Sequence, residues 1–366
     1  MKNKRIQLAK NGINVGIIGV GNCSSALIQG VHYYQNAKEN QTVPGLLRTK
    51  FGEYHIRDIK FVAAFDIDSR KVGKDLGDAI YSPPNNTRVF CKVPELGVQV
   101  MQGQIMDSIG KYVKPIVKVD KKNRAADVAA ILRETEVDVV LNYLPVGSEQ
   151  ATRWYAQQAI DAGCAFLNCM PVFIASDKDW QEKFQKAKLP VIGDDVMGQI
   201  GATVLHKSIV KMLVERGVRI GESYQLNIGG DTDFLNMLEQ TRLVSKRISK
   251  TSAVKAMVPY TIPLHIGPSD FVDFLENKKI CYISIEGKYF GDTPCTIDVK
   301  LDVWDSPNSG GVVIDAIRAA KIGLDRKISG PLTSISAYAF KHPPVQAPYE
   351  VAKRWVDEFI KGKRER

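Results

Sequence analysis

An apolar run that breaks into a glycine-rich turn is the feature that most constrains the fold of this chain. Residues 15–25 read VGIIGVGNCSS, which predicts a buried strand, a tight turn at Gly19 and a helix that begins near Ser24. At Gly21 the backbone can approach a pyrophosphate, whose negative charge then faces the helix N-terminus. Ser24 stands where the dinucleotide fingerprint has its third glycine. The turn predicts a dinucleotide site, although a glycine turn in an ordinary parallel sheet would read similarly.

Asp66 stands near the end of the next expected strand, residues 60–67. A carboxylate at this point of a nucleotide-binding sheet meets the adenosine ribose and favours NAD over NADP. Asp66 follows Ser24 by 42 residues, where about 20 are usual, so we expect a loop or lid inserted between helix and strand. A helix cap is an equally good interpretation of Asp66, and Asp68 can play either role.

Strands and helices then alternate, which predicts a doubly wound parallel sheet of the Rossmann type. The expected strands are residues 138–145, 165–171 and 189–195, and the expected helices are residues 149–163 and 178–188. Ligands bind beyond the carboxyl ends of the strands in such sheets. We therefore expect the loops that follow the strands to surround one crevice: residues 19–25, 66, 144–148, 170–175 and 194–198.

The pattern changes near residue 222 to strict apolar–polar alternation, which is typical of antiparallel strands with one covered face. It is clearest in residues 224–228 and 295–303, with residues 280–292 as the partner strand and turn. Helices return at residues 311–321 and 349–360. This predicts an α+β unit inserted after the nucleotide-binding sheet. The expected division is a Rossmann domain over 1–200, an α+β domain over 201–305, and helices over 306–366 that return to the first domain.

Composition narrows the class of partner. The net charge of +10 raises the possibility of nucleic acid, but much of it lies in Lys2, Lys4, Arg5 and residues 361–366, and there is no RNA motif, zinc finger or heptad region. Solubility or an anionic small substrate explains it equally well. No apolar run reaches the roughly 20 residues of a membrane span, and the N-terminus lacks the apolar core of a signal peptide. We expect a cytoplasmic protein with no membrane or nucleic-acid partner, whose six scattered cysteines are buried thiols rather than a disulfide framework or a zinc site.

The segment of residues 229–250 carries the most telling chemistry. It presents Asp233 and then places Lys246 and Lys250 four residues apart, on one face if the segment is helical. Two adjacent ammonium groups repel each other, which lowers the pKa of at least one and provides a base near neutral pH. The pair could instead clamp a phosphate, or form a solvated helix face.

Two further places can contribute. Asp305 and Ser306 are expected to end a strand just before a helix, where they could hold a cation or phosphate, although Asp305 or Ser309 could simply cap that helix. Lys341 follows an apolar run and precedes two prolines. Its side chain is therefore expected either to extend to the surface or to point into the site.

Together these residues resemble the myo-inositol-1-phosphate synthase family, in its short bacterial and archaeal type. The resemblance lies in GVGNCSS, FVAAFDID, NYLPVGSE, GDDV, the Asp233–Lys246–Lys250 segment, HIGPSD and WDSPNS, and it runs from about Asn14 to the C-terminus. It implies a Rossmann sheet with an inserted α+β domain for catalysis and tetramerisation, bound NAD, and a homotetramer. The implied substrate is glucose 6-phosphate, and the implied product is 1D-myo-inositol 3-phosphate.

The resemblance also implies the reaction. NAD⁺ oxidises carbon 5, loss of a proton from carbon 6 gives an enolate that closes the ring on carbon 1, and the retained NADH reduces the ketone. Net redox change is zero, and lysines suit the successive oxyanions. The alternatives are a simple NAD-dependent dehydrogenase of a sugar or amino acid and a non-catalytic NAD-binding regulator.

Site residues follow from the motifs. The matching catalytic residues are Lys246, Lys250, Lys279, Lys341, Asp195, Asp233 and Asp305. The matching cofactor residues are Gly19, Gly21, Asn22, Cys23, Ser24, Asp66, Asn86, Pro145, Ser148 and Asp195. We expect Lys250 and Lys341 to transfer protons at the carbon 5 oxygen and Lys246 to lie near the phosphate or enolate. Asp305 and Ser306 are also the candidate site for a divalent or monovalent cation, and the motifs do not decide whether one binds there.

One departure from the long members of the family bears on the lysines. These members carry a lysine just after the Gly-Asp turn, where this chain has Thr293 and Pro294. Its role could pass to Lys279 or Lys288.

Overall fold

Seven parallel strands form the larger sheet of the computed structural model, which describes residues 12–119, 124–242 and 244–366. The strand order is β13-β8-β7-β6-β1-β4-β5. The bounds are β1 (Ile13–Ile18), β4 (Ile59–Asp66), β5 (Val100–Gln102), β6 (Val139–Asn142), β7 (Ala165–Asn168), β8 (Pro190–Ile192) and β13 (Gly330–Pro331). The predicted doubly wound parallel sheet is confirmed. The basic residues Lys2, Lys4 and Arg5 lie outside the described residues.

Helices cover both faces of this sheet because alternate strand residues point to opposite sides. Val139 and Leu141 of β6 belong to one apolar cluster, and Val140 between them belongs to the other. The first cluster includes residues of α1 (Asn22–Tyr34), α9 (Asp305–Asp325), α10 (Thr333–Ala339) and α11 (Tyr349–Ile360). The second includes residues of α3 (Val128–Glu134), α4 (Glu149–Ala162) and α5 (Lys178–Lys186). A short α2 (Leu76–Ala79) follows β4.

The second sheet has four strands in the order β10-β9-β11-β12. Its bounds are β9 (Arg219–Gly229), β10 (Leu264–Phe271), β11 (Lys278–Tyr289) and β12 (Thr293–Trp304). The predicted antiparallel pairing holds for β9 with β11 and for β11 with β12. Strand β10 pairs with β9 in parallel and was not predicted, because its sequence LHIGPSDF interrupts any alternation with glycine and proline.

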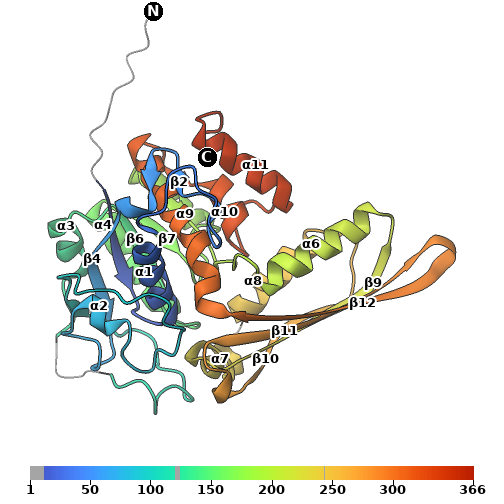
Figure 1. Ribbon diagram of the computed structural model, residues 1–366, viewed down its shortest axis with the longest axis horizontal. Helices are drawn as coiled ribbons and strands as arrows, with labels where there is room; N and C mark the ends of the chain where they lie inside the picture. Colours follow the sequence, from blue (N-terminus) through green and yellow to red (C-terminus); the bar gives the residue numbers. More distant parts are fainter. Residues whose placement is uncertain (1–11, 120–123, 243) are drawn as a thin grey trace, which may run out of the picture.

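Helices α6 (Ala202–Glu215) and α8 (Val244–Lys255) lie along one face of this sheet (Figure 1). Val210 and Val254 from these helices pack there against Cys281 and Ile283 of β11. Between the sheet and α8 the chain forms α7 (Thr232–Met237) and the one-turn η2 (Gln240–Arg242), and two further one-turn helices, η3 (Asp273–Leu275) and η4 (Phe290–Asp292), flank β11.

Helix α9 connects the two sheets, since it begins directly after β12 and runs back across α1 (Figure 1). It is longer than the predicted helix of residues 311–321. The alternative that Asp305 or Ser309 caps this helix is wrong, because Trp304 precedes the helix and makes no side-chain capping bond, while Asp305 is its first residue. Asp305 is thereby placed where the second sheet meets the first.

The insertion between α1 and β4 is a small folded unit and does not reach the cavity described below. It forms the hairpin β2 (Lys50–Phe51) and β3 (Tyr54–His55), followed by η1 (Ile56–Asp58). The fully buried guanidinium of Arg318 in α9 donates to the carbonyls of Arg48, Thr49 and Tyr54. The predicted insertion is confirmed, but the segment forms a hairpin that packs on α9 and not a lid over the cavity.

All six cysteines are free thiols, as predicted, but only Cys164, Cys169 and Cys281 are buried, and the other three are partly exposed. Within the described ranges, the helices are too short or too polar to cross a bilayer.

Candidate functional site

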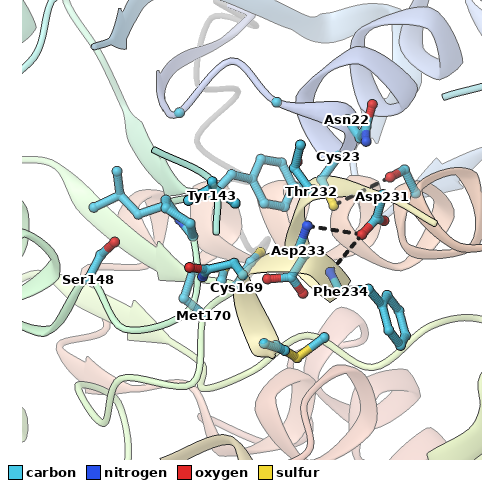
Figure 2. A pocket seen from close by; sticks show the side chains of 18 of the residues that line it. Asn22, Cys23, Tyr143, Ser148, Cys169, Met170, Asp231, Thr232, Asp233 and Phe234 are labelled. Atoms are coloured by element: carbon cyan, nitrogen blue, oxygen red, sulfur yellow. Dashed lines mark hydrogen bonds between the residues drawn. The ribbon is translucent and has the colours of Figure 1, made fainter. Parts of the chain in front are cut away.

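A cavity of about 320 Å³ lies at the carboxyl edge of the parallel sheet, where the second sheet and α7 meet it. Figure 2 shows Asn22 and Cys23 from the start of α1 and Asp231 and Asp233 from the region of α7 gathered at this pocket. Its volume falls in the range of small-molecule and cofactor sites. The position is the one that a doubly wound sheet favours for ligands.

The glycine turn forms one wall of the cavity. Gly19 has φ of +89°, and a Cβ there would lie 2.7 Å from the carbonyl oxygen of Tyr143, so only glycine fits. Gly21 has no heavy atom within 4 Å of its Cβ position and opens on the cavity. The Ser24 hydroxyl donates instead to the Gly19 carbonyl, and Ser24 is not among the lining residues.

Asp66 lies beside this turn and lines the cavity. Its Oδ2 accepts from the amide of Val20 at 2.7 Å, and its Oδ1 accepts from the amides of Ile67 and Asp68. Asp68 also lines the cavity, but its carboxylate is paired with Arg70. Burial raises the pKa of Asp68, and Arg70 outweighs it, so the pKa lies below its ordinary value. Asp66, which is not paired with a cation among the described residues, is therefore better placed than Asp68 to accept hydrogen bonds from a ligand.

Asp195 is the centre of the charged part of the site. Its Oδ1 lies 3.0 Å from Lys341 Nζ and 3.3 Å from Lys246 Nζ, and its Oδ2 accepts from the Ser249 hydroxyl at 2.6 Å. Burial alone would raise the pKa of Asp195, but the two ammonium groups hold it far below its ordinary value. The carboxylate stays charged and binds both lysines at once.

Lys279 and Asp305 form a second ion pair of 2.8 Å. Burial lowers the pKa of Lys279, and the Asp305 carboxylate outweighs it, so the pKa lies above its ordinary value. Asn277 supports the pair, because its carbonyl accepts from the Asp305 amide and its side chain bridges Ser306 and Asp231. Lys288, the alternative to Lys279, is exposed near the far end of the β11–β12 hairpin.

The remaining lysine, Lys250, has no hydrogen bond or ion pair to any residue that the structure describes, and it is only 4% exposed. Burial first, and then the charges of Lys246, Lys279 and Lys341, lower its pKa well below the ordinary value. Lys341 also has a pKa lowered by burial, to about 8, because Asp195 offsets only part of the cost. The alternative of a solvated helix face for Lys246 and Lys250 is therefore wrong. Lys341 lines the cavity, which was one of its two expected positions.

Asp231 and Asp233 add acceptors at the start of α7. Asp231 caps the helix by accepting from the amides of Asp233 and Phe234 at 3.0 Å each (Figure 2). Burial, with the nearby Asp233 and Asp305, raises the pKa of Asp231 to about 7. The Oδ1 atom of Asp233 is buried and has no hydrogen-bond partner in the described part of the chain. That acceptor, which lines the cavity, fits a ligand that donates hydrogen bonds.

Comparison with known proteins identifies the family. The family model described as Myo-inositol-1-phosphate synthase matches residues 201–306. An inositol-3-phosphate synthase of Mycolicibacterium smegmatis is 52% identical over 357 residues, which cover 96% of this chain and 98% of that protein. The chain belongs to the myo-inositol-1-phosphate synthase family.

Two further relatives agree. The inositol-3-phosphate synthase of Mycobacterium tuberculosis is 51% identical over 97% of each chain. The solved structure of a protein named Ari2 is 32% identical, with a TM-score of 0.76, and the match covers 96% of this chain and 99% of that one. The resemblance inferred from the sequence motifs is thus confirmed for the family and for the fold.

This synthase-family chain brings together most of the predicted site residues. All seven predicted catalytic residues line the cavity, as do Gly19, Gly21, Asn22, Cys23, Asp66, Pro145 and Ser148. Ser24 does not, and neither does Asn86, whose amide donates to the side-chain oxygen of Asn22 and whose Nδ2 donates to the Gly230 carbonyl. Reasoning from the sequence missed Ser249, although its spacing from Lys246 and Lys250 places it on a neighbouring part of the same helix.

The cation at Asp305 and Ser306 stays a prediction. One oxygen of Asp305 is already bound to Lys279. In the described ranges, no three or more His, Cys, Asp or Glu side chains are grouped so that they could hold a metal ion.

Asp195→Asn should lower the pKa of Lys341 below its native value of about 8, because the amide no longer offsets burial and the charges of Lys246 and Lys279. The more distant Asp305 carboxylate remains in the variant. NMR titration of the protein with labelled lysine side chains measures the shift. Asp298→Asn, which changes an exposed carboxylate of β12, is the control. An unchanged pKa of Lys341 in Asp195→Asn would contradict the pairing described above.

Proposed function

We propose that this chain converts D-glucose 6-phosphate to 1D-myo-inositol 3-phosphate, with NAD as a bound cofactor. The observation that carries the proposal is that one cavity joins a nucleotide-type glycine turn to four lysines, of which Lys246 and Lys250 are buried and Lys279 and Lys341 partly buried. Membership of the family and the names of relatives about 50% identical support the same reaction. A dinucleotide alone would need no such lysine cluster.

The residues at the turn fit NAD. The open space beside Gly21 leaves room for a diphosphate next to the N-terminus of α1. Asp66 keeps acceptor capacity toward ribose hydroxyls, and Asn22, Cys23, Pro145 and Ser148 complete the wall. When bound, NAD supplies a reversible hydride acceptor, so that the reaction needs no external oxidant. We propose these residues as the ones that hold it.

The pairing of the lysines supports separate roles for them. Burial and the neighbouring lysines lower the pKa of Lys250 well below its ordinary value, so this lysine can accept the hydroxyl proton at carbon 5. Lys341 has a pKa of about 8, lowered by burial, and can exchange a proton with the same oxygen. Burial lowers the pKa of Lys246, but Asp195 and Asp233 outweigh it, so the pKa lies above its ordinary value. This lysine therefore remains an ammonium that balances the phosphate or the enolate. Asp195 holds Lys246 and Lys341 in place.

A homotetramer is part of the proposal. The face of the second sheet opposite α6 and α8 carries Tyr224 and Tyr282, which are 45% and 41% exposed. Tyr282 lies opposite Lys300 and Tyr224 opposite Ser284, so the two tyrosines share that face. Aromatic side chains on an open sheet are typical of contact surfaces, which supports self-association there. The cytoplasmic location and the lack of a nucleic-acid partner stay predictions.

Phosphorus NMR of the purified protein with glucose 6-phosphate and catalytic NAD⁺ should show inositol phosphate without added reductant. Lys250→Ala should lower kcat by about 10²- to 10⁴-fold, because it removes a group that moves a proton. Lys255→Ala on the exposed side of the same helix is the control and should keep native turnover. Accumulation of NADH in proportion to substrate would instead indicate a simple dehydrogenase.

Gly21→Val should weaken NAD binding at least tenfold and leave thermal stability near native, because φ of −91° suits any residue and the added methyl groups enter the cavity. Calorimetric titration measures the affinity. Gly30→Ala, farther along α1, is the control, since its Cβ would meet only Ile314 at 4.0 Å. Native affinity in Gly21→Val would exclude the turn as the diphosphate site.

Tyr282→Asp should shift the protein to a smaller species in sedimentation velocity, because it places a charge on the face proposed for self-association. Met212→Asp changes an apolar residue of α6 that is 50% exposed on the other side of the sheet, and it should leave the sedimentation unchanged. Equal sedimentation of Tyr282→Asp and the native chain would remove this face from the proposed assembly.

A further inference from the structure

Three buried polar side chains form a hydrogen-bonded chain beneath the cavity. Asn142 ends β6, Asn168 ends β7, and Asp194 follows β8, which are neighbouring strands of the parallel sheet. Asn142 Nδ2 donates to Asn168 Oδ1 at 2.9 Å, and Asn168 Nδ2 donates to Asp194 Oδ1 at 2.7 Å. All three are 0% exposed, and none of them is among the residues that line the cavity. Contact with a ligand therefore does not explain them.

The Asp194 carboxylate is held by neutral donors alone. Besides Asn168, it accepts from the amides of Ile174, Ala175 and Ser176 at 3.0 Å each and from the Ser176 hydroxyl at 2.8 Å. Burial raises its pKa to about 6, although these donors act to lower it, so it is mainly ionised at neutral pH. Both oxygens face N–H groups, and an amide at this position could not accept from all of them.

The backbone of Asp194 fixes the catalytic segment that follows it. Its N–H donates to the carbonyl of His342 at 3.1 Å, and the His342 N–H donates back at 3.0 Å. The Lys341 N–H donates to the carbonyl of Asp195 at 2.8 Å. Asp195 has φ of +61°, an uncommon conformation for a residue other than glycine, which needs support from its surroundings. The backbone segments that carry the Asp195 carboxylate and the Lys341 ammonium are thus hydrogen-bonded to each other.

The other end of the chain reaches the cofactor side of the cavity. Asn142 Oδ1 accepts from the amide of Leu144 at 3.2 Å, at the start of the loop that carries Pro145 and Ser148. Asn142 Nδ2 also donates to Thr152 of α4. One continuous set of hydrogen bonds therefore joins the loop proposed to hold NAD to the lysine cluster.

We propose that Asp194 is a positioning residue for the reaction, which sets Asp195 and Lys341 relative to the cofactor loop through Asn168 and Asn142. The inference rests on the proposed function. Asp194 does not touch substrate or cofactor, and it acts through the geometry of Asp195. Small displacements of catalytic groups reduce the rate more than they reduce ground-state binding, so the proposal predicts an effect on kcat rather than on KM.

Asp194→Asn should lower kcat at least tenfold, while the KM for glucose 6-phosphate and the Kd for NAD stay within about threefold of native. The assay is run well below the melting temperature of the variant. Asp177→Asn is the control, because it removes a carboxylate that caps α5 by accepting from the Trp180 amide. Asp177 lies in the same segment between β7 and α5 as the donors to Asp194, but it takes no part in the hydrogen bonds from Asn142 to Asp194. A crystal structure of the variant without ligands should show Lys341 Nζ and Asp195 Oδ1 farther apart than the native 3.0 Å.

The proposal is overturned if Asp194→Asn keeps the native kcat, or if Asp177→Asn loses kcat to the same extent. If Asp194→Asn does not fold, Ser176→Ala decides, since it removes one of five donors: a severalfold loss of kcat supports the proposal, and native kcat overturns it. If the native chain makes no inositol phosphate, the proposed function fails instead. The distance between Lys341 and Asp195 in the variant crystal then tests the positioning role by itself.

Discussion

The carboxylate of Asp195, shared between two ammonium groups, is the interaction on which the site depends. A buried carboxylate can neutralise about one lysine, and here Lys246 and Lys341 both bind its Oδ1. Asp305 takes Lys279 in the same way. The fourth lysine, Lys250, is left in a buried place among like charges, where desolvation and repulsion both favour its neutral form. The uneven pairing of the lysines, of which Lys250 bonds to no carboxylate in the described part of the chain, therefore favours a base at this position.

This imbalance needs segments that only the tertiary fold brings together. Asp195 follows a strand of the parallel sheet, and Lys341 follows α10, which packs below the same edge. Lys246 and Lys250 come from α8, and Lys279 comes from β11 in the other sheet. Helix α9 begins at the end of β12 and packs on α1, so that it holds the two sheets against each other. Because β12 runs directly into α9 at Asp305, this connection sets the position of the ion pair between Lys279 and Asp305 relative to the glycine turn.

The sequence predicted the parts whose cause is local. Glycine at residue 19 reflects a backbone conformation, the alternation in residues 295–303 reflects one covered sheet face, and the spacing of Lys246 and Lys250 reflects a helical turn. It could not predict which lysine is paired, because the distances to Asp195 depend on segments about 50 and 146 residues away. It also failed for the parallel strand β10, and for the inserted segment, which packs on α9 through the buried Arg318 instead of covering the cavity.

The buried chain from Asn142 to Asp194 shows why such a site needs polar residues that never meet a ligand. Lysines gathered around one cavity repel one another where they are charged, and a carboxylate that could rotate or move would exchange its partners among them. A hydrophobic support below Asp195 would pack well but would leave its backbone direction unspecified. Hydrogen bonds from three strand ends specify that direction, because each donor and acceptor has one satisfied arrangement. The parallel sheet supplies this support naturally, since its carboxyl edge places Asn142, Asn168 and Asp194 on adjacent strands directly beneath the charges that they hold apart.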